Sequence, residues 1–229
     1  VYQRDRGEKS RPSRQISRQG EPMGGSIGAG VRLALSSPYL RGICLYLFSL
    51  TTTATFLYRE QRRRVSEQIP SPEKRTRLFA LIDLVVNVFT FLAQVAVTSR
   101  VISRFGLASA LVVLPIASAI GFGVIAVMPL LTVFIMFTIV RRVGEYALAK
   151  PAREVLFTVL SREEKYKAKN FIDTAISRGG DAATGWMGNG VKALSVTAGQ
   201  MAWARVPLAL LWGGVGWFLA KQEEKLRNR

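Results

Sequence analysis

Two pairs of oppositely charged residues stand inside stretches of sequence that are otherwise apolar enough to cross a membrane. Arg141 and Glu145 are four residues apart, and Arg178 and Asp181 are three apart, so each pair shares one face of a helix. A charged side chain at the centre of a bilayer costs about 2.5 to 3.5 kcal/mol on insertion scales, so it must be paired or face water. Together with Arg142, these residues are the candidates for binding or gating a charged solute.

The two pairs are expected at the same depth in the membrane. At a rise of about 1.5 Å per residue, Arg141 lies about 18 Å below the outer end of its predicted span, and Arg178 lies about 11 Å above the inner end of the next. We therefore predict an interhelical cluster in which Arg141 or Arg142 pairs with Asp181, and Glu145 pairs with Arg178. Such a cluster is either a substrate cavity or gate, or a salt-bridge latch between helices, and both interpretations stay open.

A second polar pattern, with only one charged residue, occurs in an earlier predicted span. Asp83, Asn87, Thr90 and Gln94 fall at offsets of 0, 4, 7 and 11 residues, which makes one narrow polar stripe on an apolar helix. We expect this stripe to face the interior of a helix bundle. Its members either line a cavity or make interhelical hydrogen bonds that hold the bundle together.

The elements that position these residues are predicted to be membrane-spanning helices. Residues 105–140 contain no Lys, Arg, Asp or Glu. At about 1.5 Å per residue this run is too long for one crossing of a hydrocarbon core roughly 30 Å thick, and Met128-Pro129 is the natural break because proline opposes a helix interior. The sequence thus predicts an all-α membrane protein with six transmembrane helices, at about 39–58, 78–99, 105–127, 129–149, 171–190 and 201–220.

The segments outside these spans predict how the chain is oriented. Residues 1–38 are expected to form a basic cytoplasmic linker with a short amphipathic helix, entered from something upstream, and residues 221–229 a cytoplasmic tail. With the N-terminal segment inside, 19 Lys and Arg residues lie on the cytoplasmic side and 8 outside. The positive-inside rule then places both termini in the cytoplasm and the protein in the cell (inner) membrane. Seven of the 8 outside charges lie in one expected loop, Arg59 to Arg77, which the rule does not explain.

Composition excludes several other functions. A net charge of +17 would suggest nucleic acid in a soluble protein, but here the basic residues separate apolar runs, so no nucleic-acid partner is expected. The single Cys44 cannot form an intramolecular disulfide, and the chain has no histidine, the commonest metal ligand and general base. We therefore expect no enzyme activity, no metal and no cofactor.

The stretch EYALAKPAREVLFTVLSREEKYKAKNFIDTAISRGGDA, Glu145 to Ala182, resembles the ATP/ADP translocase-like, nucleotide-transporting branch of the major facilitator superfamily. TSRVISRFG, Thr98 to Gly106, is similar to a degraded version of that superfamily's G-x-x-x-D-R-x-G loop and lacks its aspartate. The residues that carry the resemblance in the longer stretch include a predicted cytoplasmic loop motif and lie at Lys150-Pro151, Glu154, Lys165, Lys167, Lys169, Asp173 and Arg178-Gly179.

The resemblance implies a twelve-helix bundle of two six-helix halves around a central cavity, with a basic linker between the halves. This chain would be the C-terminal half, a fragment whose partner is the missing N-terminal half. The implied function is secondary transport by alternating access, as an antiporter for an anionic small molecule such as ATP or ADP, although many similar sequences have no assigned substrate. The alternative is a non-transporting membrane scaffold or anchor built on a transporter-like bundle.

Overall fold

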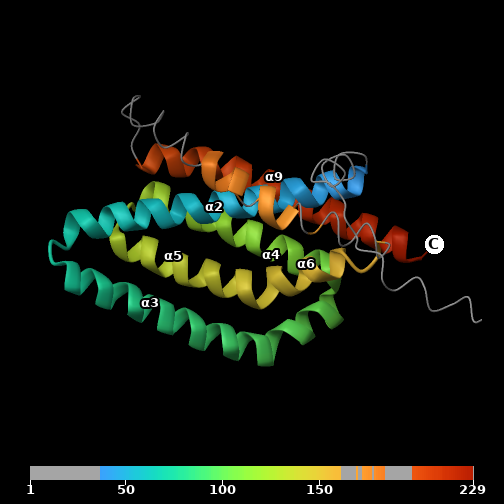
Figure 1. The fold of residues 1–229 in the computed structure, drawn as a ribbon, viewed down its shortest axis with the longest axis horizontal. Coiled ribbons are helices and arrows are strands. Elements are labelled where there is room, and N and C mark those ends of the chain that lie inside the picture. The colour runs from blue at the N-terminus through green and yellow to red at the C-terminus, as the bar shows by residue number, and fades with distance from the viewer. Residues whose placement is uncertain (1–36, 161–168, 170–171, 177, 184–197, 229) are drawn as a thin grey trace, which may run out of the picture.

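The computed structural model describes residues 37–160, 169, 172–176, 178–183 and 198–228, and its regular elements in these ranges are all helices (Figure 1). Short π-helical turns, labelled η, continue or interrupt the α-helices. The elements are α2 (Pro38–Gln68), α3 (Pro72–Ala93), η1 (Gln94–Thr98), α4 (Ser99–Val127), α5 (Leu131–Gly144), η2 (Glu145–Ala149), α6 (Lys150–Leu156), η3 (Ile172–Ile176) and α9 (Ala198–Arg227).

Four of the described helices are long and apolar enough to cross a membrane. They comprise Pro38–Gln68, Pro72–Ala96, Arg104–Val127 and Gly199–Arg227, and they contain or overlap the predicted spans 39–58, 78–99, 105–127 and 201–220. The all-helical prediction is thereby confirmed for the described residues, and the architecture is compatible with a membrane protein.

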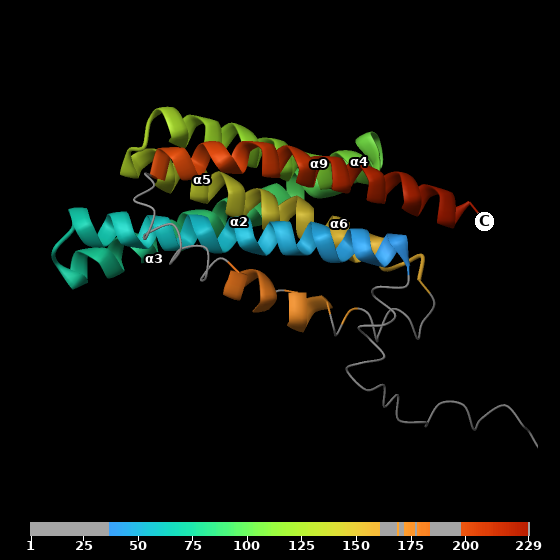
Figure 2. The same cartoon turned by 90° about the horizontal axis from the view of Figure 1, so that it is seen from above.

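The two other predicted spans, 129–149 and 171–190, are not among these four helices. The predicted span 129–149 corresponds to a continuous helical run, α5–η2–α6, whose middle carries Arg141, Arg142 and Glu145. Most of the predicted span 171–190 lies outside the described residues, as do residues 1–36. The described parts of that span, η3 and residues 178–183, are helical and lie along α2 (Figure 2).

Successive helices alternate in direction, so that α2 begins and α9 ends at the same end of the bundle (Figure 1). The Tyr39 hydroxyl donates to the Leu156 carbonyl at 2.7 Å, which ties the start of α2 to the end of α6. At the opposite end, Gly199 lies beside the carbonyl of Ala126, so α9 begins where α4 ends. Residues 172–183 therefore occupy a stretch of chain that leads from one end of the bundle to the other.

The expected loop Arg59 to Arg77 is instead mostly helix, which corrects the prediction. Helix α2 continues to Gln68 and α3 begins at Pro72, with the Ser71 hydroxyl accepting from the Lys74 amide at 3.5 Å. The Arg75 side chain donates to the Ile69 and Pro70 carbonyls and closes the turn between the helices. Hydropathy shows where an apolar surface ends, whereas a helix continues as long as its backbone is paired.

A bend occurs where α4 enters the bundle. Gly106 has φ 74° and ψ 176°, a conformation that glycine adopts without a steric penalty from Cβ. The predicted start of the third span at residue 105 coincides with this bend. The preceding segment, predicted as a short loop, is helical from Ser99 onward.

Close helix contacts at small residues build the core. Helices α4 and α9 pack along their length, with Gly213 against Pro115 and Gly216 against the Leu111 carbonyl. The Tyr46 hydroxyl of α2 donates to that same carbonyl at 2.9 Å. Small residues let helix backbones approach closely where lipid would give no hydrophobic force to join them.

An aromatic cluster packs the end of the bundle opposite the start of α2 and the end of α9. Phe122 contacts the rings of Phe56 and Phe137 in tilted and edge-on arrangements, with ring centroids 6.0 and 5.3 Å apart, and Phe134 is fully buried beside them. A Cβ atom added at Gly121 would overlap the ring of Phe137.

We expect Gly121→Ala to destabilise the protein, because the Phe137 ring must move out of its place in the core. Overpacking of this kind costs about 1 to 3 kcal/mol. Gly123→Ala is the matched control, since a Cβ at residue 123 of the same helix meets nothing within 4 Å. The two variants are compared by thermal unfolding in detergent, and equal unfolding temperatures would contradict this description of the core.

Candidate functional site

The most deeply buried charge in the described structure is Arg141, on α5. Its side chain is 3% exposed, and its Nη1 lies 3.2 Å from Oε2 of Glu145, one turn further along the helix. Its Nη2 donates to the backbone carbonyl of Leu50, in the middle of α2, at 3.1 Å. Arg141 therefore joins two helices through a buried, charge-assisted hydrogen bond.

Arg142, the next residue, points to another neighbour. Its Nη1 lies 2.5 Å from Oδ1 of Asp83 on α3, and the two side chains are 31% and 58% exposed. The expected partner was Asp181, so the structure corrects this pairing. Successive residues of a helix point about 100° apart, which is why Arg141 faces α2 while Arg142 faces α3.

Asp181, the remaining acid of the predicted cluster, bonds to α2. Its Oδ1 accepts a hydrogen bond from the Thr55 hydroxyl, and Gly180 packs against the side chain of Thr51. Arg178 is exposed, and Glu145 is paired with Arg141 instead. The predicted pairs between helices are therefore wrong among the described residues.

The reason is the position of α2. It lies between α5 and residues 172–183 (Figure 2), and both contact it. Arg141 and Asp181 consequently meet polar groups of α2 rather than each other. A run of hydroxyl residues, Thr51 to Thr55 with Ala54 between them, supplies those groups in the middle of α2. This run was the signal that sequence reasoning missed.

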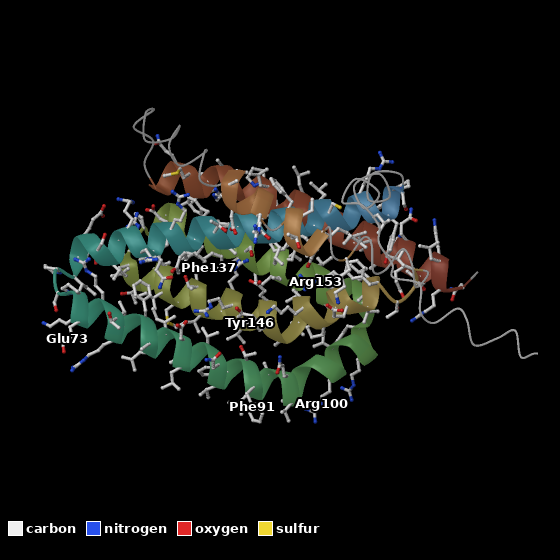
Figure 3. All side chains as sticks on the ribbon, in the orientation of Figure 1. Glu73, Phe91, Arg100, Phe137, Tyr146 and Arg153 are labelled. Atoms are coloured by element: carbon white, nitrogen blue, oxygen red, sulfur yellow. The ribbon has the colours of Figure 1, made fainter. Side chains whose placement is uncertain are left out.

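The polar stripe of α3 makes interhelical contacts at two of its positions. Asp83 pairs with Arg142, and the Gln94 amide donates to the Tyr146 carbonyl at 3.2 Å. Asn87 is exposed. In Figure 3, Tyr146 lies on the side of η2 that faces α3, whereas Phe91 and Arg100 point away from the bundle. The two observed contacts are those expected of hydrogen bonds that hold helices together.

Residues of the predicted loop motif form a second charged group. The Lys169 ammonium lies 2.6 Å from Oε2 of Glu154, and Lys150 lies 4.1 Å from the ring centroid of Tyr146. Lys165, Lys167 and the side chain of Asp173 lie outside the described residues. The described members thus tie the segment after α6 back to that helix.

Another charged group, at the far end of α2, was not predicted as a site. The largely buried Glu60 accepts ion pairs from Arg63 and Arg64, at 2.5 and 3.0 Å. Arg64 also donates to the Pro129 carbonyl at 2.5 Å and lies 4.5 Å from the ring centroid of Phe134. These contacts give two of the unexplained basic residues a structural role, because Arg64 ties α2 to the turn between α4 and α5.

Three π-helical turns lie in the second, fourth and fifth helical runs of the described chain, as η1, η2 and η3. Turns η1 and η2 contact each other, and η2 begins at Glu145, the partner of Arg141. Such wide turns are rare and are frequent at functional sites. The region around Arg141 therefore combines a buried cation, a nearby hydroxyl run and irregular helical backbone.

Comparison with known proteins adds no assignment, since no family model, curated protein or solved structure matches this chain.

We expect Arg64→Ala to lower the stability more than Arg62→Ala does. Removing Arg64 takes away a hydrogen bond from a charged donor and one partner of the buried Glu60, at a cost of about 1.5 to 3 kcal/mol. The control, Arg62, lies on the exposed ring of Tyr58 in the same helix. Thermal unfolding of the two variants in one detergent makes the comparison, and an equal loss would show that the contact with Pro129 contributes nothing.

Proposed function

We propose that the chain is the C-terminal six-helix half of a secondary transporter of the major facilitator type, which moves an anionic solute by alternating access. The observation that carries the proposal is the burial of Arg141 where the first helix, α2, meets the fourth, α5. Ion and substrate sites of secondary transporters occur near the membrane midplane at the interface of internal repeats. A nucleotide such as ATP or ADP is the solute that the sequence resemblance suggests.

The pattern of helix contacts supports an internal repeat of three helices. Numbered along the chain, the first helix contacts the fourth and the third contacts the sixth. The second helix, α3, contacts the fourth, α5, and correspondingly the first, α2, contacts the fifth, which includes η3. The third helix, α4, contacts the fourth, and correspondingly the sixth, α9, contacts the first. Exchanging helices one to three with four to six reproduces these contacts, as expected of repeats related by a two-fold axis, although the smaller contact of α6 with α9 has no counterpart of similar size between α2 and α4.

The surroundings of Arg141 suit a reversible anion site. A carboxylate or phosphate of the solute would compete with Glu145 for the guanidinium and gain charge-assisted hydrogen bonds. The Leu50 carbonyl would hold the arginine in place during this exchange. Because Glu145 begins η2, its release would be coupled to the irregular part of the helix, and a solute that binds one arrangement better shifts the population toward it.

The exposed surface of α3 fits the missing N-terminal half. This helix is largely unburied, and together with the first turn of η1 it exposes apolar residues at Leu81, Leu84, Val88, Phe89, Phe91, Leu92 and Val95. Asp83 and Asn87 lie exposed on the same helix, and a purely lipid-facing surface would avoid such polar groups.

The test of function uses the complete encoded protein, with its N-terminal half, reconstituted in lipid vesicles. We expect exchange of external labelled ATP or ADP, or of another organic anion, against internal substrate. Arg141→Ala should weaken substrate binding about 10- to 100-fold, the worth of one hydrogen bond to a charged group, while Arg62→Ala keeps wild-type binding. Binding is measured by calorimetry on folded variants.

The outcomes separate transport from a static role. A folded Arg141→Ala protein with unchanged substrate binding but lost transport would make the arginine a latch. A wild-type protein without exchange of any nucleotide or organic anion would overturn the proposal. It would favour the alternative, a membrane scaffold. The observation behind this alternative is that Arg141 already has partners within the chain itself.

A further inference from the structure

A groove of about 770 Å³ runs between α2 and α9. One wall comes from the first turns of α2, with Arg41 and Gly42, and the other from α9 between Pro207 and Phe218. Its lining is almost entirely apolar, with Arg41 as its charged residue. Its volume lies in the range of roughly 300 to 1,000 Å³ that is usual for ligand sites.

The length of the groove matches one leaflet of a bilayer. Pro207 and Phe218 are eleven residues apart on one helix, which corresponds to about 16 Å at 1.5 Å per residue. Half of a hydrocarbon core about 30 Å thick is close to 15 Å. An acyl chain lying along α9 would therefore start at the membrane surface and end near the midplane.

The charged end of the groove lies at the expected level of lipid headgroups. Gly42 packs against Leu219, which places the neighbouring Arg41 about level with Lys221. Lys221 lies 3.9 Å from the ring centroid of Trp217, whose side chain is exposed. Aromatic and basic residues of this kind mark a membrane interface. Arg41 is exposed, and among the described residues no acidic side chain pairs with it.

We propose that this groove binds an anionic phospholipid, with the phosphate at Arg41 and one acyl chain between α2 and α9. On the predicted topology the lipid belongs to the cytoplasmic leaflet, where basic sites between helices bind anionic headgroups. Gly214 lines the groove, and a side chain at this residue would extend into its open space, because a Cβ there would meet nothing within 4 Å. The site is separate from Arg141 and does not depend on transport.

The test compares dioleoyl-phosphatidylglycerol with dioleoyl-phosphatidylcholine, which have the same acyl chains and differ in headgroup charge. Each lipid is titrated into the complete protein in detergent, and bound lipid is counted by native mass spectrometry. We expect phosphatidylglycerol to bind more tightly. Arg41→Gln should weaken its binding about fivefold, the equivalent of about 1 kcal/mol per basic residue near the surface, and leave phosphatidylcholine binding unchanged. Lys225→Gln, in the C-terminal turn, is the charge control and should have no effect.

Filling the groove tests the acyl-chain site. Gly214→Leu should reduce binding of both lipids at least tenfold, whereas Gly123→Leu, at an equally open position of α4, should not. Equal affinities for the two lipids in the wild type, or no effect of Arg41→Gln, would overturn the proposal. So would unchanged binding in Gly214→Leu. If Gly214→Leu fails to fold, the comparison of the two headgroups and the Arg41→Gln variant still test whether the groove binds an anionic phospholipid.

Two further results would assign the groove to another occupant. Displacement of phosphatidylglycerol by an equal concentration of glycerol 3-phosphate would indicate a site for a soluble phosphate. A concentration-dependent dimer that Gly214→Leu abolishes, detected by light scattering, would indicate a second copy of the chain. Either result would contradict binding of a lipid.

Discussion

A guanidinium buried between apolar helices needs hydrogen-bond partners, and Arg141 has one carboxylate and one backbone carbonyl, while its Nε finds no partner among the described residues. The carboxylate, Glu145, comes from its own helix, so the charge is balanced before α5 packs against any neighbour. The carbonyl, Leu50, comes from α2 and fixes the height of one helix against the other. Breaking a buried ionic interaction on one side leaves an uncompensated charge. Losing either partner of Arg141 would therefore destabilise the packing of α5 on α2.

In the rest of the bundle, some helices pack closely at small residues and others meet through polar groups. Helices α4 and α9 meet through glycines, which bring their backbones together and leave little room for side chains. Helix α2 also meets its neighbours through hydroxyls, a backbone carbonyl and the side chain of Arg64. Rigid contact on one side and exchangeable hydrogen bonds on the other are what an assembly needs if one group of helices is to move against another.

Much of this organisation could be predicted from the sequence, because uncharged runs report directly on long apolar helices. The predicted boundary at residue 105 falls beside the bend at Gly106, where a glycine conformation interrupts the helix. Charge and spacing also identified Arg141 and Glu145 as residues on one face, and the two do form a pair. These inferences needed only distances along a single helix.

The partners between helices could not be predicted in the same way. Depth in the membrane fixes the height of a residue but not the direction it faces or the helix that lies beside it. Arg141 or Arg142 was expected to pair with Asp181 at one depth, yet α2 lies between the two helices and supplies Thr55 to the acid. Likewise, hydropathy could not show that α2 continues to Gln68 beyond its apolar part, because ion pairs along the helix stabilise that extension.

The π-turn at Glu145–Ala149 has a consequence for how this sequence can change. A turn with one more residue than an α-helical turn rotates all later side chains by about 100° relative to an uninterrupted helix. The residues of α6 that face inward, Ala152 and Leu156, do so only with this offset. A single-residue deletion between positions 145 and 149 would therefore turn the inward face of α6 toward a different neighbour, while leaving the four long apolar helices at their original length.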